Sequence, residues 1–193
     1  MFNVFDLVVY PGYGVARVSR EVVKEINGNS LLFYELKFLN KDVTILVPCE
    51  GINSVGVRPL SSRDDLMKIF DIFCTEYSDD WFFNITLISW NRRNKDYQNR
   101  IRKGMFLDLA LIYRDLKYIE KLKGLSFGEK SILNQVDALV SEECAVIQER
   151  PVEVVSKELN LCCIECITGN SHLLANFLSF DIHINNGSAS IHD

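Results

Sequence analysis

The chain has 193 residues, of which 48% are hydrophobic and 24% charged, and its formal net charge is -5. This composition is typical of a globular protein and excludes a disordered one, and the length allows one ordinary domain or two small ones. No apolar run approaches the roughly 18 residues that a membrane-spanning helix needs, and the first residues lack the basic segment of a secretory signal. We therefore expect a cytoplasmic protein without a membrane partner.

Up to about residue 60, the sequence predicts short strands separated by tight turns. Apolar runs begin at Leu7, Val15, Leu31, Val43 and Val55, and Pro, Gly or Asn residues separate them. Five short strands with no helical stretch among them indicate a small, strongly bent β-barrel of the Tudor or SH3-like kind. Its charges balance at six of each sign, so we expect its partner to be a protein rather than DNA.

From Ser61 the apolar period changes from two to 3.6, which predicts a helical bundle. Four helices are expected up to residue 150: one capped by Ser61 or Ser62, one from Trp90 to Gly104, one over 105–122 that ends at Gly124, and one after a capping box at Ser126 and Glu129. Their predicted buried faces are Leu66, Ile69, Phe70 and Phe73; Leu109, Ile112, Tyr113 and Leu116; and Ile132, Val136, Leu139 and Val140.

The C-terminal residues carry a weaker pattern. Residues 152–167 are compatible with a further helix, and the rest of the chain has no clear period. The sequence therefore predicts an α+β protein in three parts: a β-barrel at residues 1–60, a helical domain at 61–150 and an extension at 151–193.

Six basic residues and a single acid, Asp96, follow Trp90 in an otherwise acidic chain. A local charge near +5 indicates contact with a polyanion. A large flat indole beside phosphate-binding arginines can also wedge against an unstacked base step. The alternatives are a solvated helix face and a tryptophan of the core. Nucleic acid is the first hypothesis for the partner of this basic segment, whose residues are Arg92, Arg93, Lys95, Arg100, Arg102 and Lys103.

Six cysteines are present, and Cys162, Cys163 and Cys166 include a C-x-x-C spacing. No second pair or histidine set follows at zinc spacing, so we expect no metal and no cofactor, with a redox or zinc sensor left as an alternative. The remaining three stand alone and are explained as buried free thiols. No nucleophile elbow, phosphate-binding loop or zinc-protease motif is present, so we expect neither an enzyme nor a small-molecule substrate. The lone cysteines are Cys49, Cys74 and Cys144.

The run from Phe2 to Val15 resembles the opening of the CarD/CdnL family of bacterial transcription regulators. Further matches follow in the family's order and spacing, and together they cover about residues 2–150. They lie at Phe33-Tyr34, Val47-Pro48, Val55–Arg58, Trp90–Lys95, Arg114–Leu116 and Leu125–Lys130.

This resemblance implies that the barrel docks on the RNA polymerase β subunit through a strand edge, and that the helical half lies on promoter DNA at the upstream edge of the transcription bubble. It implies that Trp90 wedges at the minor groove, which stabilises the open complex, while Arg92, Lys95 and Lys130 hold phosphates. Arg93 is a further candidate. Lys130 is also expected in the first turn of a helix, where backbone N–H groups favour phosphate. A protein-only adaptor that bridges the polymerase to another partner is the alternative.

Two positions depart from the pattern of the family that the chain resembles. Phe5 stands where the family usually has glycine, so the first turn of the barrel must make room for a large side chain or change its conformation. Leu46 stands where some members carry an arginine that faces the polymerase, which predicts a more apolar docking surface. Lys24 on the neighbouring hairpin keeps a positive charge for the same contact.

Overall fold

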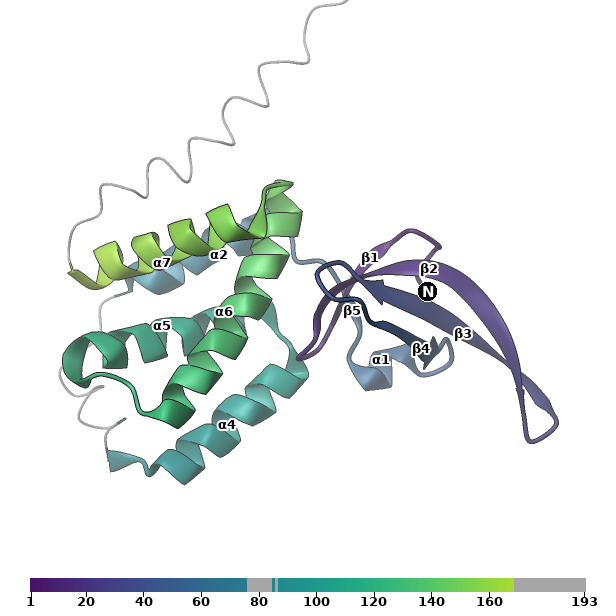
Figure 1. Ribbon diagram of the computed structural model, residues 1–193, viewed down its shortest axis with the longest axis horizontal. Helices are drawn as coiled ribbons and strands as arrows, with labels where there is room; N and C mark the ends of the chain where they lie inside the picture. The colour runs from purple at the N-terminus through teal and green to yellow at the C-terminus, as the bar shows by residue number, and fades with distance from the viewer. Residues whose placement is uncertain (76–84, 86, 169–193) are drawn as a thin grey trace, which may run out of the picture.

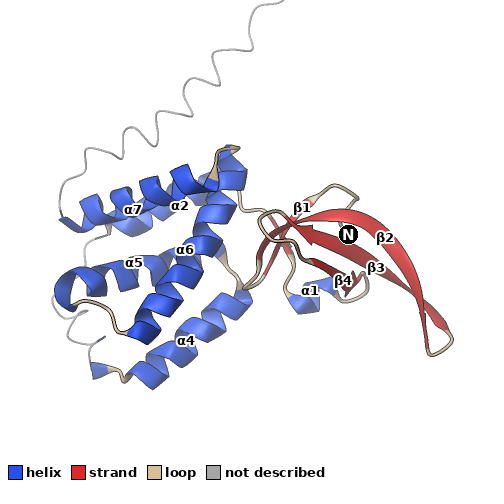
Figure 2. Cartoon of the chain, in the orientation of Figure 1, coloured by secondary structure: helices blue, strands red, loops and turns tan. Residues whose placement is uncertain are grey.

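The computed structural model describes residues 1–75, 85 and 87–168, which form an antiparallel sheet followed by helices (Figures 1 and 2). The α+β class and the order of sheet before helices are those predicted from the sequence. The strand order is β4-β3-β2-β1-β5, so the sheet has two edges and is not closed into a barrel, although it fits a Tudor-like domain. The strands are β1 (Leu7–Tyr10), β2 (Gly14–Ile26), β3 (Asn29–Phe38), β4 (Thr44–Pro48) and β5 (Arg58–Pro59).

The last strand was predicted to begin at Val55, but it begins only at Arg58. Residues Ile52–Val55 form a single helical turn, α1, between Gly51 and Gly56, and both glycines have positive φ angles. Ile52 nevertheless packs in the core of the sheet domain (β1–β5 with α1), because one helical turn can bury an apolar residue as well as a strand can. Of the predicted strand, Val55 lies in this helical turn and is exposed, Val57 is buried, and Arg58 and Pro59 form β5.

Phe5 adopts the conformation that the expected glycine would favour. Its φ is +77°, and its N–H donates to the Val18 carbonyl oxygen at 2.7 Å, which holds the first turn against β2. The ring finds room by pointing outward, with 74% of the residue exposed. A left-handed backbone costs a non-glycine residue about 1–2 kcal/mol, so this turn keeps its shape at some expense of stability.

The helices of the second half begin and end where the sequence predicts. Ser62 and Ser126 both form capping boxes, with Asp65 and Glu129 respectively, and Gly104 ends its helix in the left-handed conformation. Every residue of the predicted helical faces is buried. None of the described helices is long and apolar enough to cross a membrane. The helices are α2 (Arg63–Cys74), α4 (Trp90–Lys103), α5 (Phe106–Lys123), α6 (Phe127–Gln148) and α7 (Val152–Thr168).

The two halves have separate apolar cores, and α6 connects them. Near its C-terminal end, Glu143 accepts two hydrogen bonds from the Arg58 guanidinium, each 2.7 Å long, and two more from the N–H and hydroxyl of Ser61. Arg58 Nε donates at 2.9 Å to the carbonyl oxygen of Gly104, the residue that ends α4. These contacts fix both α6 and the end of α4 against the sheet domain.

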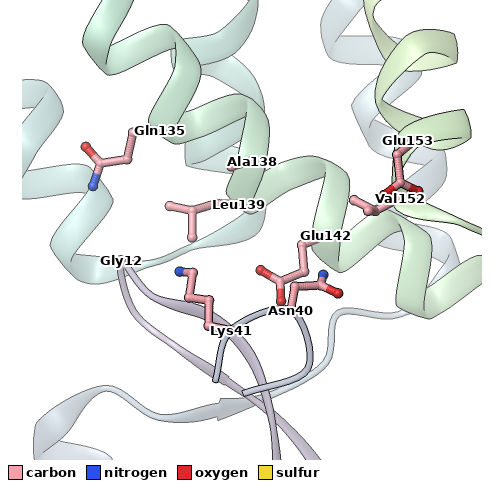
Figure 3. Close-up of a pocket in the computed structure, with 9 residues that line it drawn as sticks. All are labelled: Gly12, Asn40, Lys41, Gln135, Ala138, Leu139, Glu142, Val152 and Glu153. Atoms are coloured by element: carbon pink, nitrogen blue, oxygen red, sulfur yellow. The ribbon is translucent and has the colours of Figure 1, made fainter. Parts of the chain in front are cut away.

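Glu142 makes the neighbouring contact with the sheet domain, at a hollow of about 470 Å³ (Figure 3). It accepts hydrogen bonds from the Val15 N–H and the Asn40 side chain. A Cβ at Gly14 would lie 2.1 Å from its Oε2 atom and would push this carboxylate aside, and the φ of +111° at this position also favours glycine. Burial raises the pKa of Glu142 above its usual value. We call these contacts the junction cluster, which comprises Gly14, Arg58, Ser61, Glu142 and Glu143.

Candidate nucleic-acid interface

Trp90 is the first residue of α4, and its indole lies against Gly128 in the first turn of α6. A Cβ at Gly128 would come within 2.6 Å of the indole Cζ2 atom, so the ring rests directly on the α6 backbone. The side chain is half-buried and packs against the edge of the bundle core. The indole is therefore firmly seated and still keeps part of its surface in solvent.

A buried ion pair supports this seat. The Arg93 guanidinium carbon lies 5.7 Å from the centroid of the Trp90 ring, and its Nη2 atom donates to Glu129 Oε1 at 2.8 Å. Although burial opposes ionisation of Glu129, hydrogen bonds from Ser126 and Arg93 outweigh it and lower the pKa of this carboxyl. Arg93 and Glu129 expose less than a tenth of their surfaces, so Arg93 acts on the indole and not on solvent. We call these residues the interface cluster: Trp90, Arg93, Ser126, Gly128 and Glu129.

The outer face of α4 carries the exposed part of the basic segment. Because an α-helix advances about 100° per residue, positions 92, 95, 99 and 102 follow one another along the side opposite Arg93 and Tyr97. Arg92 and Lys95 are exposed there. Arg100 is half-buried and donates to the Asp108 carbonyl oxygen at 3.1 Å, so it belongs to the packing between α4 and α5. The exposed basic ridge therefore consists of Arg92, Lys95, Arg102 and Lys103.

Lys130 lies in the first turn of α6 and is exposed, as predicted. It does not share the face of Gly128, because residues two apart in a helix point in nearly opposite directions. It lines instead a polar hollow of about 490 Å³ between α5, α6 and α7, together with Lys117 and Lys157. The structure therefore separates Lys130 from the indole that the sequence grouped with it.

Phe127 is a surface aromatic that sequence reasoning missed. It is the first residue of α6, next to the Gly128 on which the indole rests, and 90% of it is exposed. Burial of such a side chain is worth about 1.5–3 kcal/mol, so this ring offers an apolar contact to a partner that covers it. The only available signal was its place between Ser126 and Glu129 of the capping box, where the first helical residue points away from the core.

The two residues expected to face the polymerase lie on one face of the sheet. Lys24 pairs with Leu31 across β2 and β3, and Leu46 pairs with Glu35 across β3 and β4. Side chains alternate between faces along a strand, so Leu31 and Glu35, four residues apart, point to the same side. Both Lys24 and Leu46 are exposed, and β4 is an edge strand whose outer backbone groups can pair with another chain.

The described residues contain no group of three or more His, Cys, Asp or Glu side chains arranged to hold a metal ion. Cys49 and Cys144 are buried free thiols, as predicted, whereas Cys74 is exposed. The expectation of a buried Cys74 is wrong because this residue ends α2, one position beyond the buried Phe73. The zinc alternative would draw on His172 and His183 as further ligands, and both lie outside the described residues.

Comparison with known proteins identifies both halves of the chain. The model of the CarD-like/TRCF RID domain matches residues 2–61, and that of the CarD C-terminal domain matches residues 84–160. The chain is also similar to a protein of Bacillus subtilis (strain 168) named "Putative transcription factor YdeB", with 29% identity over 143 residues, which is 74% of this chain and 90% of that protein. The matched spans include the whole sheet and both helices of the interface cluster, and they leave out residues 62–83 and those after 160.

Proposed function

Since the chain belongs to the CarD/CdnL family of transcription regulators, which interact with RNA polymerase, we propose that it bridges the polymerase β subunit and promoter DNA. In this proposal the sheet domain docks on the polymerase, and the interface cluster with the basic ridge meets the DNA at the upstream edge of the melted region. The bridge stabilises the open complex. The protein acts in the cytoplasm, where the polymerase works.

The seating of Trp90 is the observation that carries the DNA half of the proposal. An apolar ring that wedges at a base step must resist being pushed back, and an unstacked step costs a few kcal/mol. The Gly128 backbone lies behind the indole and the buried Arg93–Glu129 pair beside it. Arg93 is therefore proposed as a positioning residue for Trp90 in place of a phosphate contact.

Phosphate contacts are assigned to Arg92 and Lys95, which are exposed about half a turn and one and a half turns after Trp90 on the outer face of α4, so DNA at the indole must extend around the start of this helix to reach them. Such contacts give affinity and orientation but little sequence choice, so promoter preference should follow the ease of melting. Lys130 remains a proposed phosphate contact only for DNA that extends around the tip of α6 toward the α5–α7 side.

The polymerase contact is assigned to the face that carries Lys24 and Leu46 and to the neighbouring β4 edge. An extended segment of the partner can add to an edge strand through main-chain hydrogen bonds, while side chains on the face give selectivity. Leu46 contributes an apolar contact here. The junction cluster then transmits the position of the docked sheet domain to α4, whose 14 residues span about 21 Å from Gly104 to Trp90.

The test is the lifetime of the open complex on a defined promoter, with polymerase from the same organism. Wild type should lengthen it, and Trp90→Ala should remove most of that effect while polymerase binding stays intact. Trp90→Phe keeps an aromatic ring on Gly128 and should retain part of the effect. The Tm of each variant shows whether the bundle is intact, because the indole also packs on the core.

Charge reversal separates the bridge from a protein-only adaptor. Arg92→Glu with Lys95→Glu should shorten the open-complex lifetime and weaken binding most at low salt, since screening already reduces these contacts at high salt. Lys68→Glu on α2, an exposed lysine with no proposed DNA or polymerase contact, is the control for charge reversal. If the double reversal changes nothing while polymerase binding persists, the DNA contact is wrong and the adaptor is favoured.

A further inference from the structure

Two cysteines that are far apart in the sequence meet at the ends of two helices. Cys74 is the last residue of α2 and Cys166 lies in the last turn of α7, 92 positions later. Their Sγ atoms are 2.6 Å apart. The two helices lie side by side in the bundle (Figure 1). No movement of either helix is therefore needed to bring these thiols within bonding reach.

We propose that Cys74 and Cys166 form a redox-modification site, at which a reversible disulfide fastens α7 to α2. The sequence drew attention to Cys163 and Cys166 through their C-x-x-C spacing, but Cys163 is fully buried. The structure pairs Cys166 with a residue of another helix instead. This inference is independent of the proposed bridging function.

The exposure of the two thiols sets the order of the chemistry. Cys74 is exposed and reaches oxidants first, whereas Cys166 is half-buried. Burial and contact with Cys74 raise the pKa of Cys166, so its thiol is protonated at neutral pH and is the poorer initial nucleophile. Cys74 is therefore the residue that an oxidant modifies, and Cys166 is the residue that resolves the modification.

Hydrogen peroxide serves as the oxidant in this scheme. The Cys74 thiol loses its proton, and its thiolate attacks one oxygen of the peroxide; the O–O bond breaks, and the hydroxide that leaves takes up this proton to become water as Cys74 becomes a sulfenic acid. Cys166 loses its proton as its sulfur attacks Cys74, which expels the sulfenic oxygen as a second water. In total, two thiols and one peroxide give one disulfide and two waters. A small dithiol reverses the step by exchange.

The position of the pair gives the disulfide a defined structural effect. Cys74 lies between the two spans that match family models, and Cys166 lies beyond the second, so the site belongs to parts of this chain outside the shared domains. A bond there would tie together the first and last helices of the described bundle. A cross-link between residues so distant in sequence restricts the unfolded chain strongly. Oxidation should therefore stabilise the helical bundle.

The experiment uses the full chain, treated with hydrogen peroxide after complete reduction. Free thiols are then alkylated, the protein is digested, and disulfide-linked peptides are identified by mass. We expect one linked pair that joins the Cys74 and Cys166 peptides, and its loss on treatment with dithiothreitol. The Tm of the oxidised protein should rise by roughly 10 °C, the order of shift that closing so long a loop predicts.

Two variants and one control sharpen the test. Cys74→Ser and Cys166→Ser should each abolish the linked pair and the rise in Tm. Cys162→Ala lies one turn from Cys166 on α7 and should keep both. A dominant link between other cysteines would overturn the proposal, and so would equal alkylation of Cys74 and Cys166 before and after oxidation. Tightly bound zinc that protects both thiols from peroxide would also overturn it.

Discussion

The junction cluster and the interface cluster each contain a buried glutamate of α6, but only the interface cluster holds an aromatic side chain that is partly exposed to solvent. Glu143, near the C-terminal end of α6, is surrounded by donors from Arg58 and Ser61 and is almost wholly buried. Glu129, in the first turn, is just as buried, but it supports an indole that stays partly in solvent. The contacts of Glu143 hold the two halves of the molecule together, whereas those of Glu129 hold the Trp90 indole at the surface.

The difference shows that one helix, α6, can fix the junction of the two halves near one end and position a surface side chain at the other. A buried charge must be matched by partners, so both glutamates fix the residues around them. At the junction those residues face inward and fill the space between the two halves. At the tip of α6 the same principle positions Trp90 at a surface, where part of its area stays available to a partner.

The largest expected effect comes from breaking the junction. Glu143→Ala removes both hydrogen bonds to Arg58 and both from Ser61, leaving a half-buried guanidinium without its carboxylate. Loss of one partner of a buried pair costs about 3–5 kcal/mol. Urea unfolding should show a loss of that order, against less than about 0.5 kcal/mol for Glu50→Ala at an exposed site. Equal losses would mean that the junction does not hold the halves together.

A smaller effect should distinguish the acids by the pH dependence of stability. Burial raises the pKa of Glu142 in the fold, so the stability it contributes is present below the unfolded value of 4.5 and is lost as pH rises through the folded pKa. Hydrogen bonds lower the pKa of Glu129, so its contribution is present above 4.5 and is lost as pH falls through the folded pKa.

Glutamine variants test these opposite signs. Relative to wild type, Glu142→Gln should gain unfolding free energy as pH rises above 4.5, because wild type must ionise a buried carboxyl. Glu129→Gln should fall behind wild type as pH rises toward 4.5 and keep that deficit at neutral pH. Denaturant unfolding between pH 3.5 and 8 measures both differences. Curves of the same sign would show that the two acids do not lie in different electrostatic surroundings.

The smallest effect on stability is expected at the recognition end. Phe127→Ala removes a ring that is 90% exposed, so the free energy of unfolding should change by less than about 0.5 kcal/mol. If the ring meets DNA beside Trp90, the open-complex lifetime should nevertheless shorten, by less than for Trp90→Ala. Met67→Ala, at an exposed apolar residue of α2, is the control. An unchanged lifetime would leave Trp90 as the sole proposed apolar contact at this tip.

Local signals in the sequence predicted most of the elements. Serine and acid pairs at 62–65 and 126–129 gave the helix starts, and Gly104 gave a helix end. These signals work because capping and left-handed glycine are decided within a few residues. The strand predicted at 55–59 failed at its start for the same reason, since Val55 belongs to a helical turn between two glycines that is too short for its apolar pattern to be told from a strand.

The sequence by itself determined the order of sheet and helices, the buried faces, the basic segment and the family. Only the tertiary packing decided which charged side chains are exposed to solvent and which are buried in ion pairs. Arg93 and Arg92 are neighbours in one run, but Arg93 faces Glu129 and Arg92 faces water. Packing also brought Cys74 to Cys166 and turned Lys130 away from Trp90. Helical periodicity says which residues share a face, but only the position of the neighbouring helices says which partner that face meets.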